Sequence, residues 1–189
     1  MPHYLTNQNR SLFLENYEYS VFDLRKENSV SIRVFSNTMR GQILYGKSIL
    51  DLIERFTEYS GRMKALPDWL NNGAIVGLQG GTSTIKKIHE QLWMADFGEA
   101  LPFTGVIKGS LSASSYHNQY CEEWARLNQE VTRESGQTDL IYFNRSGFTK
   151  SPGYNQLFWE GDQTTTWDEY DGFKSALQGL IGGIFWFEH

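Results

Sequence analysis

The second part of the chain alternates short apolar stretches with helical patterns, and this alternation most strongly limits the fold. Apolar stretches of strand length occur at residues 74–79, 92–96, 140–143 and 157–159. A helix is predicted to begin near Thr82 or Ser83, directly after the first stretch. A second helix is predicted from side chains at helical spacing, namely Tyr116, Tyr120, Trp124, Leu127 and Val131. Because strands joined by helices run parallel, the sequence predicts an α/β fold with a parallel sheet.

The first part of the chain has a different pattern. Residues 12–45 contain short apolar and polar alternations, such as residues 29–35, which predict strands with one buried face. A helix is predicted from Ser48, with Asp51 completing a capping-box-like start and Gly61 ending it. At the other end of the chain, the apolar tail from residue 173 predicts a buried helix that leads into a last strand at residues 184–187.

Two of the predicted strands end in a carboxylate. Residues 93–99 read Trp-Met-Ala-Asp-Phe-Gly-Glu, and residues 159–163 read Trp-Glu-Gly-Asp-Gln. The carboxyl ends of parallel strands meet at one edge of a sheet or barrel, where active sites lie in (β/α) barrels. Two opposed carboxyl groups are what the cleavage of a glycosidic bond requires. The sequence therefore indicates that Asp96 and Asp162 act on a sugar.

Composition argues against several other classes of function. The net charge of −5 and the lack of a Lys/Arg cluster argue against nucleic-acid binding. No apolar run approaches the length of a membrane span, and the first ten residues lack the pattern of a secretory signal, so we expect a cytoplasmic protein. Cys121 is the only cysteine, and the four histidines show no ligand spacing. We therefore expect no metal site and no cofactor.

Four ordered motifs lie at residues 77–82, 93–102, 143–147 and 159–163. Together they resemble glycoside hydrolase family 31, and within it the bacterial sulfoquinovosidases. The resemblance implies a partial (β/α) TIM-type barrel preceded by the end of an N-terminal β-sandwich. It divides the chain into residues 1–63, the end of the sandwich with a linker helix, and residues 64–189, a truncated barrel with the catalytic site.

The resemblance also implies residue roles for a retaining α-glycosidase, an α-glucosidase relative that acts by double displacement. Asp96 corresponds to the nucleophile and Asp162 to the general acid/base. Arg145 corresponds to a contact with substrate hydroxyls, and Gln79 to a residue that lines the sugar pocket in the sulfoquinovosidase branch. The implied substrate is an α-sulfoquinovoside or a related α-glucoside.

Three further residues are assigned more loosely. Trp93 and Trp159 could offer apolar faces to the sugar ring, and Glu99 could support Asp96 from behind. Each assignment has a plainer alternative. An Asp at a strand end is often a helix cap, and a tryptophan is more often buried in a core.

The length of the chain conflicts with a complete barrel. The stretch from Gly73 onward is less than half of the about 250 residues that a (β/α)₈ barrel needs. Between Gln79 and Asp96 there is room for one helix only. The sequence therefore predicts an internally deleted and C-terminally truncated form with impaired hydrolysis and exposed barrel edges that could drive oligomer formation. A non-catalytic carbohydrate-binding protein and an inactive fragment stay open as alternatives.

Overall fold

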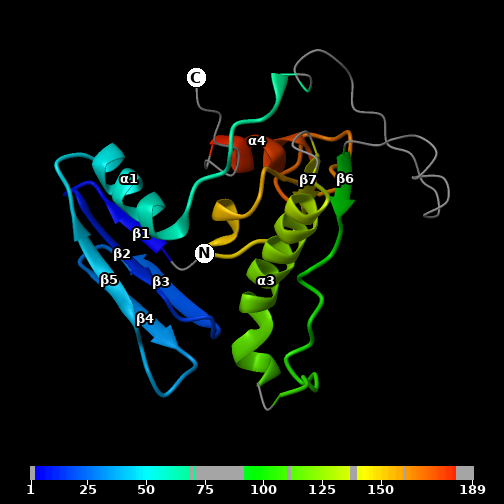
Figure 1. Cartoon of the computed structure of the whole chain (residues 1–189). Coiled ribbons are helices and arrows are strands. Elements are labelled where there is room, and N and C mark those ends of the chain that lie inside the picture. The colour runs from blue at the N-terminus through cyan, green and yellow to red at the C-terminus, as the bar shows by residue number, and fades with distance from the viewer. Residues whose placement is uncertain are drawn as a thin grey trace.

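The computed structural model describes residues 3–68, 70, 92–109, 112–136, 140–159 and 161–181. The described residues form two groups of elements, shown side by side in Figure 1. Antiparallel strands and one helix make up the N-terminal group, and a parallel sheet with a long helix makes up the other. The predicted strand at residues 74–79, the helix near Thr82 and the strand at residues 184–187 lie outside the described residues.

The N-terminal strands confirm the predicted β-rich segment. Strands β1 (His3–Thr6), β2 (Arg10–Leu14) and β5 (Gly41–Tyr45) form an antiparallel sheet in the order β1-β2-β5. Strands β3 (Ser20–Lys26) and β4 (Ser29–Val34) pair as an antiparallel hairpin. The predicted division at residues 63 and 64, and the assignment of this group to a β-sandwich, stay predictions.

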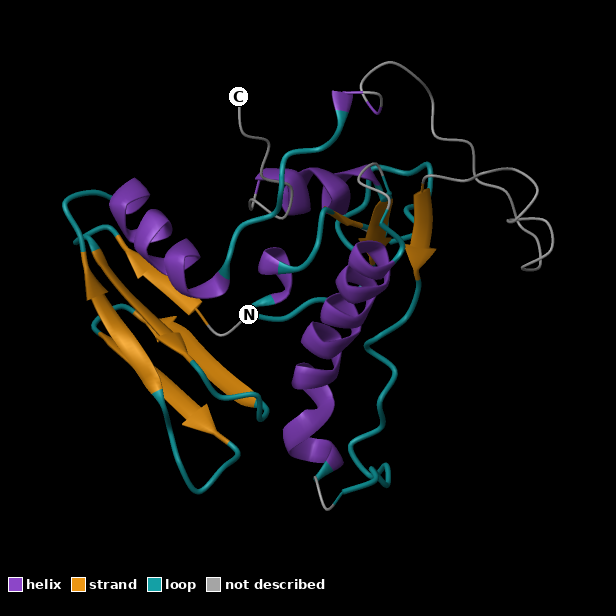
Figure 2. Cartoon of the chain, viewed as in Figure 1, coloured by secondary structure: helices purple, strands orange, loops and turns teal. Residues whose placement is uncertain are grey.

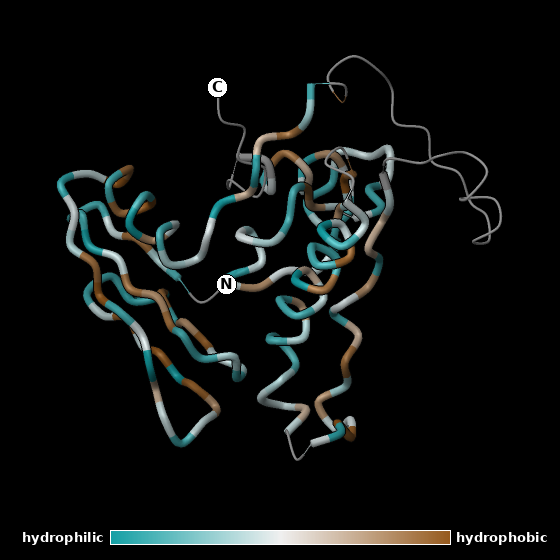
Figure 3. Tube along the Cα trace, in the orientation of Figure 1, coloured by the Kyte–Doolittle hydropathy of each residue, from teal (hydrophilic) through white to brown (hydrophobic). Residues whose placement is uncertain are grey.

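The prediction that residues 29–35 bury one face is wrong. Val30 is exposed, and the Phe35 side chain just after β4 is 64% exposed. Apolar segments recur along the N-terminal strands in Figure 3. Alternation identifies which face of a strand is apolar, but it carries no information about what packs on that face.

Helix α1 (Ile49–Ser60) follows the predicted capping pattern. The backbone N–H of Asp51 donates to Ser48 Oγ over 3.1 Å, and Asp51 Oδ2 accepts from the Lys47 N–H over 2.7 Å. Gly61 ends the helix with φ 83°, and its N–H donates to the Thr57 carbonyl. Local sequence thus sets both ends of this helix.

Replacing Ser48 by Ala is expected to lower the free energy of unfolding by about 1 kcal/mol, because the Asp51 N–H loses its acceptor. Urea unfolding measures this change. Ser112 is the matched control, since it occupies the same cap position of helix α3 but its side chain makes no capping hydrogen bond. Equal losses in Ser48→Ala and Ser112→Ala would contradict the prediction.

Helix α1 packs its apolar face on the N-terminal sheet. Leu52 and Phe56 are buried, and the Phe56 ring stacks on His3 with 4.1 Å between ring centroids. Phe13 of β2 meets the edge of Phe56 at 5.0 Å. These aromatic rings form a core within the N-terminal group.

The second group contains a parallel sheet, as predicted. Strands β6 (Leu92–Ala95), β7 (Ile141–Asn144) and β8 (Leu157–Phe158) are parallel in the order β6-β7-β8. Helix α3 (Ala113–Glu134) connects β6 to β7 (Figure 2). The fold is mixed α/β, and the three described strands of this sheet do not close into a barrel.

Two shorter helices follow. The 3-10 helix η2 (Ser151–Gly153) precedes β8, and helix α4 (Phe173–Ile181) lies in the C-terminal part. The prediction of a buried tail helix is wrong for its described side chains, because Phe173 and Leu177 are both exposed. Across the described ranges, none of the helices combines the length and apolar character needed to span a bilayer.

A buried carboxylate joins the two groups. Glu122 of α3 is 5% exposed and accepts from Tyr17 Oη over 2.7 Å and from the Lys150 N–H over 2.6 Å. Asn118 Nδ2 donates to the Tyr17 carbonyl over 2.7 Å. Burial raises the pKa of the Glu122 carboxyl, although these hydrogen bonds oppose the shift.

Glu122→Gln is expected to change how stability depends on pH. Because the folded pKa of Glu122 lies above the unfolded value, its contribution is fully present below about pH 4.5 and is lost as the pH rises through the folded pKa. The free energy of unfolding of Glu122→Gln relative to the wild type should therefore increase between about pH 4 and pH 7. Urea unfolding across this range provides the measurement.

Glu123→Gln is the control, because the neighbouring Glu123 pairs with Arg126 at the surface. Comparing each variant with the wild type cancels the contributions of other titrating groups such as His3, whose pKa burial lowers to about 4. A flat difference for Glu122→Gln across the pH range would show that the buried carboxyl is not linked to stability.

Candidate active site

Three side chains follow the carboxyl ends of the parallel strands. Asp96 comes directly after β6, Arg145 directly after β7, and Trp159 directly after β8. Ala95 is paired with Asn144, the last residue of β7, and Asn144 is paired in turn with the last residue of β8. The three residues therefore emerge at the same edge of the sheet, as expected for an active site of a (β/α) fold.

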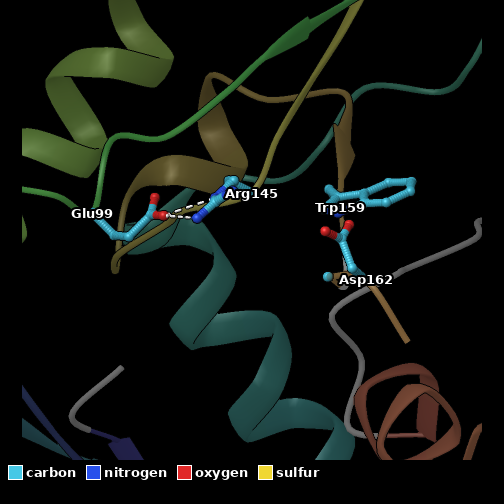
Figure 4. Close-up of a pocket in the computed structure, with 5 residues that line it drawn as sticks. Glu99, Arg145, Trp159 and Asp162 are labelled. Atoms are coloured by element: carbon cyan, nitrogen blue, oxygen red, sulfur yellow. Dashed lines mark hydrogen bonds and ion pairs between the residues drawn. The ribbon is translucent and has the colours of Figure 1, made fainter. Parts of the chain in front are cut away.

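A pocket of about 340 Å³ opens at this edge (Figure 4). Its lining residues are Glu99, Arg145, Trp159, Gly161 and Asp162. Figure 4 shows Glu99 and Arg145 on one side of the pocket and Trp159 and Asp162 on the other. The structure thus brings four of the predicted site residues into one cavity.

Arg145 links two carboxylates. Its Nη1 lies 3.3 Å from Asp96 Oδ1, and its Nε donates to Glu99 Oε1 over 2.7 Å. Nη2 also contacts Glu99 Oε1. The hydrogen bond to Glu99 raises the pKa of Arg145 above its ordinary value, with the two negative charges adding to the effect. Glu99 therefore contacts Asp96 only indirectly, through the Arg145 guanidinium that both carboxylates share.

The ion pairs are open to solvent. The side chains of Arg145, Glu99 and Asp96 are 37%, 41% and 42% exposed. Exposed ion pairs stabilise a fold by at most about 1 kcal/mol. Here the ion pairs mainly orient the Arg145 guanidinium, which lies over the Phe97 ring at 4.7 Å from the ring centroid.

Asp96 has one oxygen occupied. Its Oδ1 accepts from the Phe97 N–H over 2.9 Å and faces Arg145 Nη1. Within the described residues, no hydrogen bond reaches Asp96 Oδ2. The carboxylate is therefore held by one oxygen, and Asp96 itself is not among the residues that line the pocket.

The remaining predicted residues lie in different places. Trp93 does not line the pocket, because its indole Nε1 donates to Asn128 of α3 over 3.1 Å and its ring stacks on Tyr142 at 5.6 Å. Trp159 lines the pocket and its ring lies 5.9 Å from Phe143. Gln79 lies outside the described residues.

Sequence reasoning missed the residues that hold the turn after β6. Phe97 has φ 63° and Gly98 has φ 96°, and both values are left-handed. Ser146 and Trp124 donate side-chain hydrogen bonds to carbonyls of this segment. These long-range contacts leave no local signal in the sequence. Among the described residues, no group of His, Cys, Asp or Glu is arranged to hold a metal ion.

The carboxyl edge of the parallel sheet thus carries a pocket lined by two carboxylates and an arginine. The chain belongs to glycoside hydrolase family 31, since the family's TIM-barrel domain pattern matches residues 3–186. This finding confirms the resemblance seen in the sequence.

Particular relatives are sulfoquinovosidases. The enzyme of Escherichia coli strain K12 is 38% identical over 90 residues, which cover 47% of this chain and 13% of that enzyme. The enzyme of Agrobacterium fabrum is 33% identical over 90 residues, which cover 47% and 14%. A solved family 31 sulfoquinovosidase from E. rectale, bound to an aza-sugar inhibitor, matches 94% of this chain and 46% of its own with a TM-score of 0.84 at 20% identity. The chain thus spans less than half of that solved enzyme.

Proposed function

We propose that this chain carries the site of a retaining α-glycosidase, with Asp96 as nucleophile and Asp162 as general acid/base. One observation carries the proposal: Asp162 and Arg145 line the same pocket, and Arg145 contacts Asp96. Family 31 membership supports the reaction class. The predicted roles of Arg145, Trp159 and Glu99 belong to the same proposal.

The proposed reaction has two steps. Asp96 Oδ2 attacks the anomeric carbon while Asp162 donates its proton to the leaving oxygen, so that a covalent glycosyl-enzyme forms. Asp162 then removes a proton from water, which attacks the anomeric carbon and releases Asp96. This division requires an ionised Asp96 and a protonated Asp162 at the start, with carboxyl groups about 5 to 5.5 Å apart.

The proposed substrate is an α-sulfoquinovoside. This choice rests on the sulfoquinovosidases that the chain resembles. Trp159 would offer an aromatic face to the apolar side of the sugar ring, and Arg145 would donate to ring hydroxyls from the protons that its carboxylates leave unused.

A non-catalytic sugar-binding protein is the second candidate. It is favoured by the exposure of the site, since Asp96, Arg145 and Glu99 are all more than a third exposed in a sheet with three described strands. Water in the site weakens the electrostatic stabilisation on which hydrolysis depends. We therefore propose slow hydrolysis by the 189-residue chain.

Two further expectations belong here. Within the described residues, β6 and β8 each pair on one side only, which supports the expected assembly through sheet edges. Light scattering of the purified chain over a range of concentrations tests it. A cytoplasmic location rests on the sequence pattern alone.

The decisive experiment compares 4-nitrophenyl α-sulfoquinovoside with 4-nitrophenyl α-glucoside at equal concentrations. Faster release of nitrophenol from the sulfonated substrate, with the α-anomer of the sugar appearing first in proton NMR spectra, supports a retaining sulfoquinovosidase. Calorimetric binding of either glycoside without release would favour the sugar-binding alternative. Release of the β-anomer first would rule out double displacement.

A further inference from the structure

The turn that carries Asp96 has a strained backbone. Phe97 has φ 63°, a left-handed conformation that costs an L-residue about 1 to 2 kcal/mol. Asn and Asp occupy this region more easily because their side chains bond to the local backbone, and Phe has no such group. Gly98 follows with φ 96°. Contacts from elsewhere in the fold must therefore hold the turn.

Three carbonyls of this turn accept hydrogen bonds from side chains far along the sequence. Trp124 Nε1 donates to the Ala95 carbonyl over 3.1 Å. Cys121 Sγ donates to the Gly98 carbonyl over 3.2 Å. The third donor is Ser146 Oγ, which lies 2.8 Å from the Phe97 carbonyl. Two donors thus come from α3, and the third comes from the segment after β7.

Ser146 lies tightly against the turn. It is buried, and a Cβ atom added to Gly98 would collide with its Oγ and would lie 3.0 Å from Trp124 Cδ1. Ser146 also follows Arg145, which contacts Asp96 from the pocket side. The two residues that follow β7 therefore both contact the turn: Ser146 bonds the Phe97 carbonyl, and Arg145 contacts the Asp96 carboxylate.

The orientation of the Asp96 carboxylate depends on these contacts. Its Oδ1 accepts from the N–H of Phe97, and the position of that N–H follows from the left-handed turn. We propose that Ser146 is a positioning residue, which holds the Phe97 carbonyl so that Asp96 keeps Oδ1 on the backbone and presents Oδ2 to the anomeric carbon. This inference rests on the proposed role of Asp96 as nucleophile.

The single cysteine of the chain provides a local probe of the turn. Cys121 is buried, donates to the Gly98 carbonyl and also interacts with Ser146, so its alkylation reports exposure of the thiol, whereas the Phe97 amide reports the turn itself. Ser146→Ala is expected to raise the rate of Cys121 alkylation by iodoacetamide in native buffer by roughly five- to tenfold, the effect of one lost hydrogen bond. Hydrogen exchange of the Phe97 amide should accelerate with it, because that amide donates to Asp96.

Ser175→Ala is the matched control. Ser175 Oγ also donates to a backbone carbonyl, that of Gly172, over 2.8 Å, but at the start of α4. Both rates should stay at the wild-type value in this variant. Trp124→Phe removes the indole donor to Ala95 together with part of the ring and should raise both rates, so it carries the test if Ser146→Ala fails to fold.

The outcomes separate this inference from the proposed function. Wild-type rates of both alkylation and Phe97 exchange in Ser146→Ala would overturn the positioning role. Faster alkylation and faster Phe97 exchange in Ser146→Ala, in a chain that turns over no glycoside, would support the role of Ser146 in holding the turn. They would contradict only the hydrolase proposal. Where the wild type is active, Ser146→Ala should lower kcat and leave KM nearly unchanged, since the serine acts through Asp96 and lies outside the pocket lining.

Discussion

Asp96→Asn is expected to lower kcat for a chromogenic α-glycoside by about 10⁴-fold or more, because an amide cannot form the covalent glycosyl ester. The variant retains an oxygen for the Phe97 N–H, so the turn should persist. Initial rates measure the loss. Mass spectrometry after incubation with a fluorinated glycoside that traps the intermediate should find the sugar on the wild-type peptide that contains Asp96 and on no peptide of the variant.

Asp162→Asn distinguishes the proposed role of Asp162 from that of Asp96. A nitrophenolate leaves without protonation, so this variant should lose less of the first step with nitrophenyl glycosides than with alkyl glycosides. Asp23→Asn on the N-terminal hairpin is the control for a change of charge, since Asp23 pairs with nearby Arg25 far along the sequence from the candidate site. Asp96→Asn activity equal to that of Asp23→Asn would remove the nucleophile assignment.

Gly61→Ala is expected to lower the free energy of unfolding by about 3 kcal/mol or more. Gly61 has φ 83°, which a Cβ atom disfavours, and that Cβ would lie 2.5 Å from the Cα of Gly153. The contact is with backbone of η2, which has no flexible side chain to move away. Relief of the clash would push α1 and η2 apart, and overpacking of this kind adds about 1 to 3 kcal/mol. Urea unfolding provides the measurement.

Gly136→Ala is the matched control. Gly136 also follows a helix and has φ 69°, but a Cβ there meets no atom of the described residues within 4 Å. It should lose only about 1 kcal/mol from the backbone conformation. The difference between the two variants isolates the close approach of α1 to η2. Similar losses in free energy of unfolding for both variants would mean that α1 and η2 can move apart at no measurable cost.

Local signals explain which elements could be predicted. The cap of α1 is set by Ser48, Asp51 and Gly61 within its own sequence, so its bounds were predicted closely. The strands β6 and β7 are short apolar stretches next to helical patterns, and their parallel pairing followed from that order. The exposure of Phe35 and of α4 was not predictable in this way, because it depends on which elements lie opposite.

Some residues of the candidate site were likewise predictable from local motifs, and others were not. Asp96, Arg145 and Asp162 were found because they follow strands in recognisable motifs, and the edge of a parallel sheet gathers such residues. Trp93 lies on β6 three residues before Asp96, yet its side chain faces α3 and donates to Asn128. Ser146 belongs to the motif at residues 143–147, but that motif does not reveal its hydrogen bond to the turn, because the bond joins residues 49 positions apart.

The Tyr17–Glu122 hydrogen bond has a consequence for the order of folding. It joins residues 105 positions apart, whereas β1, β2 and α1 on one side, and β6, α3 and β7 on the other, are each built from nearer neighbours. Chain entropy opposes the closing of so long a loop until its ends already carry structure. We therefore expect the sheet groups to condense separately, and the buried carboxylate to lose its water only at the last stage of assembly.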